Sequence, residues 1–241
     1  MRFDGRNNNE LRNIKITTNF LNKTNSSVLI EFGNTKVLCV SSFEAKQPQF
    51  LLNTDEGWVT AEYSMLPCSS DQRIPRERSK VGGRTQEIQR LIGRALRAVV
   101  DTKKLNKHTI TVDCDVLQAD GGTRTASITG AYVSLSILFK DMINKGILLE
   151  NPFIDSVSAV STGIVKGENV TDLNYVEDSS AEVDMNFVIT GSGKIVEVQG
   201  TAEEKPFTKK QLDDMYELAE QSCNQLKKLQ EIALDFDVKS K

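Results

Sequence analysis

The stretch DCDVLQADGGTRTASITG, residues 113–130, separates two segments with different hydrophobic periods. Before it, apolar residues at 110, 112, 114 and 116 alternate with polar ones, which predicts a strand with one buried face. After it, an apolar run continues without a breaker to Gly146, which predicts a long and mostly buried helix that stops at this glycine. The chain is therefore expected to pass from strand to helix through Gly121-Gly122.

A glycine pair lets the backbone approach a ligand closely, and free N–H groups at a helix start attract anions. Arg124 in that first turn therefore predicts a phosphate clamp, although a tight turn with a solvated arginine remains the alternative, because neither a Walker motif nor GxGxxG is present. Arg84 follows Gly82-Gly83 in the same arrangement. Two helix starts could thus offer arginine to one anion.

At 241 residues with 39% hydrophobic content, the chain can bury a substantial core. It has no long apolar run and no signal-peptide pattern, so we expect a soluble, cytoplasmic protein. The four cysteines show no CxxC spacing and are expected to be reduced. His108 is the only histidine, so acid–base or metal chemistry must depend on carboxylates.

Charge is distributed unevenly along the chain. Residues 71–97 carry eight Lys or Arg against three Asp or Glu, whereas residues 172–241 carry eight against fifteen. A basic surface beside an acidic one fits a polyanionic partner better than the net charge of −3 suggests.

Periodicity predicts the remaining elements. A strand near 14–16, a hairpin over 28–40, a strand over 58–63, an amphipathic helix from 85 to 99, a strand over 155–165, a hairpin over 183–199 and a helix over 208–231 are expected. The predicted fold class is α+β, a single domain over 1–234 with a mixed, largely antiparallel sheet and a few long helices. Residues 235–241 are expected to form a disordered tail.

Asp178 and Asp184 lie six residues apart. On one unbroken strand they would be roughly 20 Å apart and could not share a metal. A bend at Ser179-Ser180 could bring them to a separation of ~4–6 Å, suited to Mg²⁺ or a shared proton. The alternative is that Asp172, Glu177, Asp178, Glu182 and Asp184 are ordinary acids of a turn and an edge strand.

Five blocks together resemble the ribonuclease PH family of bacteria. They are RFDGR at 2–6, GRTQEIQRLIGR at 83–94, DGGTRTASITG at 120–130, DLNYVEDSSAEVDMN at 172–186 and EVQGTAE at 197–203. The resemblance runs from the N-terminus to about Leu234.

This resemblance implies a phosphate-dependent 3′-to-5′ exoribonuclease that trims the 3′ ends of transfer RNA precursors and releases nucleoside diphosphates. It also implies a homohexamer built as a trimer of dimers, with inorganic phosphate as co-substrate and Mg²⁺ as cofactor. Residues carried over by motif are Arg84, Gly122, Thr123 and Arg124 for phosphate, Asp178 and Asp184 for Mg²⁺ or the proton of the leaving 3′ oxygen, and Arg73 and Arg76 for transfer RNA.

The site that the resemblance implies agrees with the reading of the residues. A bound oxyanion must be held in line with a phosphodiester, so arginines and a metal must offset the repulsion between them. The nucleophile is already an anion and needs no imidazole base. Two features depart from the family pattern: Cys68 stands where an arginine is common, and the segment between Arg76 and Arg84 is two residues shorter.

Three other functions compete with this one. The chain could be a ring subunit of an exosome-like complex or of a polynucleotide phosphorylase, but it ends soon after its last predicted helix, which favours a stand-alone enzyme. It could be a silent RNA-binding ring subunit, which would need neither the arginine clamp nor the carboxylate pair. It could also be a hydrolase that acts on the same RNA without phosphate.

Overall fold

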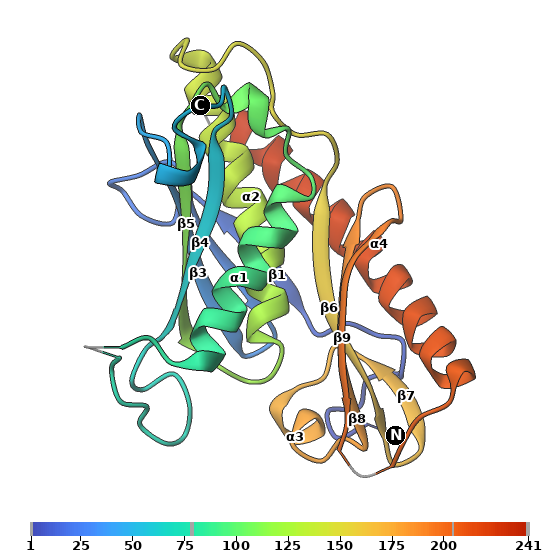
Figure 1. The fold of residues 1–241 in the computed structure, drawn as a ribbon. Coiled ribbons are helices and arrows are strands. Elements are labelled where there is room, and N and C mark those ends of the chain that lie inside the picture. Colours follow the sequence, from blue (N-terminus) through green and yellow to red (C-terminus); the bar gives the residue numbers. More distant parts are fainter. Residues whose placement is uncertain (1, 78–79, 204, 240–241) are drawn as a thin grey trace.

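The computed structural model describes residues 2–77, 80–203 and 205–239, and it contains two sheets (Figure 1). The first has the strand order β1-β2-β3-β5-β4. Its strands are β1 (Ile14–Thr18), β2 (Ser27–Phe32), β3 (Thr35–Glu44), β4 (Trp58–Met65) and β5 (Thr109–Gln118). All neighbours are antiparallel except β4 and β5, which run parallel.

The second sheet has the order β7-β6-β8-β9 and is antiparallel throughout. It consists of β6 (Val157–Val165), β7 (Glu168–Thr171), β8 (Val183–Thr190) and β9 (Ile195–Ala202). The predicted α+β class with mixed, largely antiparallel pairing is confirmed, with the strands divided between two sheets. Strand β7 was not predicted, because its four residues show no clear alternation.

Helix α2 (Thr123–Asn144) packs between the two sheets (Figure 1). Residues on every side of it are buried, because β2 and β3 cover one face and β6 covers another. Gly130 lets α2 approach the first sheet, since a Cβ there would lie 2.7 Å from Ile30 and 2.9 Å from Cys39. The two sheets and α2 share one hydrophobic core.

The other two long helices lie beside α2 and both contact it. Helix α1 (Gly83–Arg97) packs on β4, and α4 (Lys209–Lys239) packs on β6 and β7. One-turn helix α3 (Tyr175–Asp178) precedes β8, and two short 3-10 helices cover Gln49–Leu51 and Thr102–Leu105. Helix α4 continues past the predicted end at 231, so it includes 235–239 of the expected tail, and residues 240–241 lie outside the described part of the chain. None of the described helices is long and apolar enough to cross a membrane.

The sequence-predicted turn between β5 and α2 forms as expected. Ile110, Val112, Cys114 and Val116 are buried on one face of β5, and the strand ends at Gln118. Gly121 and Gly122 follow with φ of 75° and 66°, a conformation that side chains other than glycine rarely adopt. The chain thereby reverses direction within a few residues and starts α2 beside the end of β5.

Candidate active site

A cavity of about 1030 Å³ opens at the carboxyl end of β5. Every residue that the sequence predicted for phosphate binding or for chemistry lines it: Arg84, Gly122, Thr123, Arg124, Asp178 and Asp184. They come from the amino ends of α1 and α2, from α3 and from β8. Figure 1 shows both helix starts at the lower end of the molecule, where α3 also lies.

The loop from Asp120 to Gly122 forms one side of the cavity and is held rigidly. A Cβ on Gly121 would lie 2.5 Å from the carbonyl oxygen of Leu173, so only glycine fits there. The side chain of Asp120 accepts hydrogen bonds from the amide nitrogens of Asn34 and Tyr175, both at 3.2 Å. The Thr123 and Tyr63 hydroxyls are 2.9 Å apart in a buried contact. The start of α2 is therefore fixed before any anion binds.

Arg124 points across the cavity toward β9. Its Nη1 donates to Gln199 Oε1 at 3.0 Å and lies 3.7 Å from a carboxylate oxygen of Glu87. Gln199 in turn donates to Glu87 and Glu197, each at 3.2 Å. Gln199 lies in the block EVQGTAE, but the sequence indicates no role for it, because its contact with Arg124 links two distant segments.

The two carboxylates line the same cavity, and the charge of Asp178 reaches Asp184. Asn174 caps α3 through a capping box with Glu177, and Asp178 is the last residue of this helix. The chain then bends through Ser179-Ser180 and enters β8, where Asp184 is the second residue. The predicted bend is therefore present, and both side chains line the cavity.

Burial and the neighbouring charge of Asp178 raise the pKa of Asp184 to about 6. Burial also raises the pKa of Asp178, although Arg124, Arg84 and Arg12 oppose this shift. Asp184 Oδ1 is buried and has no hydrogen-bond partner. A buried carboxylate oxygen without a partner is costly, so this atom is available for a ligand or a proton.

The other acids of this segment are structural. Asp172 and Glu177 form buried ion pairs with arginines of the first twelve residues, and Glu182 accepts a hydrogen bond from the Gly167 amide at 2.8 Å. For these three, the alternative reading as ordinary acids of the fold was correct. His108 is buried at the opposite end of β5, roughly 30 Å along the strand from the cavity.

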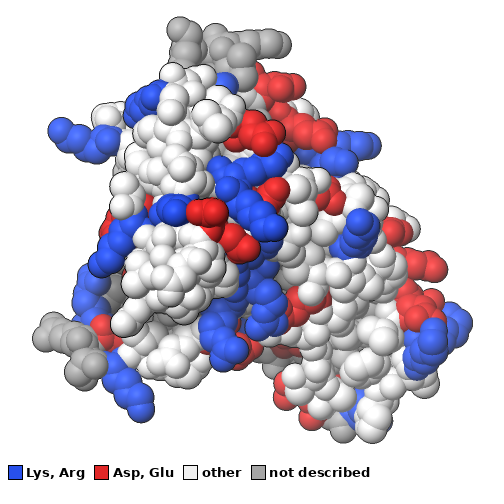
Figure 2. All heavy atoms as spheres, turned by 45° about the horizontal axis from the view of Figure 1, so that its top comes forward, with Lys and Arg blue, Asp and Glu red and all other residues white. Residues whose placement is uncertain are grey.

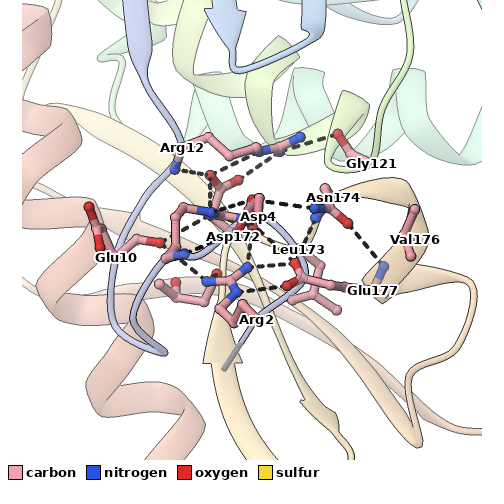
Figure 3. Close-up of polar contacts among 12 residues, drawn as sticks. Arg2, Asp4, Glu10, Arg12, Gly121, Asp172, Leu173, Asn174, Val176 and Glu177 are labelled. Atoms are coloured by element: carbon pink, nitrogen blue, oxygen red, sulfur yellow. Dashed lines mark hydrogen bonds and ion pairs between the residues drawn. The ribbon is translucent and has the colours of Figure 1, made fainter.

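Arginines of the N-terminal segment connect the two sides of the cavity (Figure 3). Arg12 donates to both carboxylate oxygens of Asp172 and also to the carbonyl oxygens of Asp120 and Gly121. Arg2 binds Glu177 in a bidentate pair, with distances of 2.7 and 2.6 Å. The sequence did not indicate these pairs, since the partners are 160 residues apart for Arg12 and Asp172 and 175 apart for Arg2 and Glu177.

The two predicted RNA-binding arginines differ in their position relative to the cavity. Arg73 lines the cavity, whereas Arg76 is exposed and does not. Cys68 also lines it and is exposed. Arg78, which the sequence also placed in this basic segment, lies outside the described residues. Figure 2 shows Lys and Arg side chains gathered near the middle of the face that it draws.

The chain matches the family models for domain 1 and domain 2 of the 3′ exoribonuclease family over residues 10–139 and 155–222. It belongs to the 3′ exoribonuclease family. It is also 54% identical over 226 residues to Ribonuclease PH of Bdellovibrio bacteriovorus, covering 94% of this chain and 93% of that one. The predicted class, a phosphorolytic 3′-to-5′ exoribonuclease, is confirmed by this relationship.

Solved structures share the fold at lower identity. Rrp46 of rice (Oryza sativa) superposes with a TM-score of 0.78 at 17% identity, covering 97% of this chain and all of that chain. A chain of the Archaeoglobus fulgidus exosome with RNA bound to the active site gives 0.80 at 22% identity, covering 94% and 91%. These likenesses establish the fold, and the exosome-subunit reading is less supported than the ribonuclease PH relationship.

Proposed function

We propose that this cavity binds inorganic phosphate beside the last phosphodiester of an RNA 3′ end and catalyses phosphorolysis. One observation carries the proposal: two helix starts that each present an arginine meet two largely buried carboxylates in one cavity. Arg84, Arg124 and the backbone of Gly122 and Thr123 hold the attacking phosphate. The same arginines offset the repulsion between the phosphate and the phosphodiester.

In the reaction, an oxygen of the bound phosphate attacks the phosphorus of the last phosphodiester. A new P–O bond forms as the bond to the 3′ oxygen of the preceding nucleotide breaks. The products are a nucleoside 5′-diphosphate and an RNA shorter by one nucleotide, whose 3′ oxygen takes up a proton. No histidine is required, because the nucleophile is already charged.

Asp178 and Asp184 act at the leaving oxygen. With a pKa of about 6, Asp184 can hold a proton at near-neutral pH and donate it to the 3′ oxygen. Among the described residues, no group of three His, Cys, Asp or Glu side chains could hold a metal by itself. In its ionised form, Asp184 could hold Mg²⁺ instead of a proton, because one or two carboxylates together with substrate phosphates bind Mg²⁺ in many sites and the Asp184 Oδ1 atom has no partner. When bound, Mg²⁺ would neutralise charge that develops on the reacting oxygens.

The proposed substrates are transfer RNA precursors and other RNA 3′ ends in the cytoplasm. Arg73 and Arg76 lie in the segment beside the cavity and would contact the RNA backbone. The proposed assembly is a homohexamer, a trimer of dimers. The fold of the chain is shared by chains of exosome complexes, which supports assembly into a multi-subunit protein. Sedimentation or mass photometry of the purified chain would test the hexamer.

The deciding experiment is incubation of RNA with and without inorganic phosphate, followed by identification of the released nucleotide. Release of nucleoside diphosphates only when phosphate is present supports the proposal. Release of monophosphates without phosphate would establish a hydrolase. Binding of RNA with no release under either condition would establish the silent RNA-binding subunit.

A further inference from the structure

Tyr175 is the one aromatic residue among the described residues that line the cavity. Aromatic side chains are usually buried, but 59% of this one is exposed. Its ring is left open to solvent at the site where the RNA end must bind. An exposed aromatic ring in the lining of a cavity is in a position to contact a ligand bound there.

The position of Tyr175 relative to the chemistry is fixed. Its backbone N–H donates to Asp120 Oδ1 at 3.2 Å, which ties it to the phosphate-binding loop. It is the first residue of α3, and Asp178 is the last. Residues three apart on a helix lie on the same side with Cβ atoms about 5–6 Å apart, so Tyr175 and Asp178 face the cavity together.

We propose that Tyr175 stacks on the base of the 3′-terminal nucleotide and so positions that nucleotide for attack. This inference rests on the proposed function of the cavity. Arginines and carboxylates around the cavity hold the phosphates and the leaving oxygen, but none of them provides an apolar surface for the base.

Stacking also meets a requirement of the reaction. An exonuclease removes nucleotides in succession, so each of the four bases must occupy the same place in turn. Every base has a π-face, and stacking on an aromatic ring therefore tolerates any sequence. A pocket that read base edges through hydrogen bonds would stall at some nucleotides.

The test combines two changes, one in the protein and one in the RNA. The substrates are a short single-stranded RNA and the same RNA whose last ribose lacks its base. The proteins are the wild type, Tyr175→Ala, Tyr175→Phe and Val176→Ala. Val176 is the matched control, because it is the next residue of α3 and half-exposed but does not line the cavity. The readout is kcat/KM for removal of the last nucleotide at saturating phosphate, together with the KM for phosphate.

We expect Tyr175→Ala to lower kcat/KM on the intact RNA by about ten- to hundred-fold, the usual worth of one stacked base. On the RNA without a terminal base, the wild type and Tyr175→Ala should be equal. Tyr175→Phe and Val176→Ala should match the wild type on both substrates, and the KM for phosphate should stay constant.

Full activity of Tyr175→Ala on the intact RNA would overturn the proposal. An equal loss on both substrates would also overturn it, because the tyrosine would then act on folding, on subunit contacts or on the catalytic groups. If the wild type released no diphosphates at all, the proposed function would fail instead. The dissociation constants of the two RNAs, measured with the same proteins, would then decide whether Tyr175 stacks on the terminal base.

Discussion

Arg12 and Asp172 form a buried ion pair, with Nη2 2.7 Å from Oδ1 and side chains that are 5% and 1% exposed. The backbone N–H of Arg12 donates to the other carboxylate oxygen at 2.7 Å. Asp172 has a φ of 51°, an unusual backbone conformation for aspartate. Because Arg12 also binds the carbonyl oxygens of the Asp120–Gly122 loop, this pair joins the phosphate side of the cavity to the segment that leads into α3 (Figure 3).

We predict that Arg12→Met lowers the free energy of unfolding by about 3 kcal/mol, because it leaves the buried carboxylate of Asp172 with only the longer ion pair to Arg6, at 3.4 Å, as a counter-charge. Denaturant unfolding measures this loss. In the double variant with Asp172→Asn, the loss should be clearly smaller than the sum of the two single losses, because the two groups form one pair. Lys15→Met is the control, since Lys15 is exposed and its ion pair with Glu31 is long, at 3.9 Å. Additive losses in the double variant would contradict the pairing.

For the phosphate clamp, we predict that Arg84→Ala and Arg124→Ala each lower the rate of phosphorolysis by more than 100-fold. This corresponds to a loss of ~3 kcal/mol of transition-state stabilisation. Each removes a charge-assisted contact to the nucleophile. Steady-state rates over a phosphate titration measure the effect, and RNA binding should change little. Arg90→Ala, on the same helix as Arg84 but outside the cavity lining, should keep the wild-type rate. Wild-type rates for Arg124→Ala at saturating phosphate would exclude Arg124 from the clamp.

The carboxylates give a prediction in which stability and activity change in opposite directions. The pKa of Asp184 is about 6 in the folded protein against an ordinary value of 3.8. Between these pH values the folded state keeps a proton that the unfolded state has released. The free energy of unfolding therefore falls as the pH rises from about 4 to 6, and it stays lower above that range. Asparagine cannot ionise, so Asp184→Asn should remove this penalty.

We expect Asp184→Asn to raise the melting temperature at pH 8 and to leave it almost unchanged at pH 4, while turnover is lost. Melting curves in metal-free buffer measure the first effect. Addition of Mg²⁺ should raise the melting temperature of the wild type at pH 8 more than that of the variant, because amides are poor Mg²⁺ ligands. Asp213→Asn is the control, as Asp213 pairs with Lys209 on the exposed side of α4. If Asp184→Asn had a melting temperature at pH 8 equal to or lower than that of the wild type, burial would not disfavour the charged carboxylate of Asp184.

Local signals were sufficient to predict much of this fold. The alternation of β5, the glycine pair and the apolar run of α2 are all set by residues close together in sequence. The two helix starts with a glycine pair and an arginine are also set by residues close together in sequence, and the structure brings them to one cavity. The division of the strands into two sheets could not be predicted, because it depends on which strands pair across long stretches of chain, as β3 and β5 do in one sheet and β6 and β8 in the other.

Contacts between distant segments explain what the sequence did not show at the site. Arg12 reaches Asp172 across 160 residues, and Arg124 reaches Gln199 across 75. Neither contact leaves a periodic pattern or a spacing that could be recognised. The pair Asp178 and Asp184 was recognisable because the bend between them is itself local, at Ser179-Ser180.

The last prediction concerns the basic segment, where the chain departs most from the family pattern. Cys68 takes the place of a cation beside the cavity, so fewer charges remain to hold the body of a transfer RNA. Arg73, Arg76 and Lys80 are all exposed and available for phosphates. Each phosphate contact contributes a salt-dependent term that arises from counterion release and reads no base.

We therefore predict that Arg73→Ala combined with Arg76→Ala weakens processing of a structured transfer RNA precursor far more than degradation of a short single strand. Only Arg73 of the two lines the cavity, so a short strand that ends at Asp178 and Asp184 would lose at most that one contact, whereas the body of a precursor would lose both. The slope of log K against log salt for precursor binding should become shallower by roughly one unit for each lost contact. Lys145→Ala, a surface cation on the opposite end of α2 from the cavity, is the control. Equal losses of activity on both RNAs would place the two arginines at the active site or in a subunit interface. Unchanged activity on both RNAs would show that this segment is only a solvated loop.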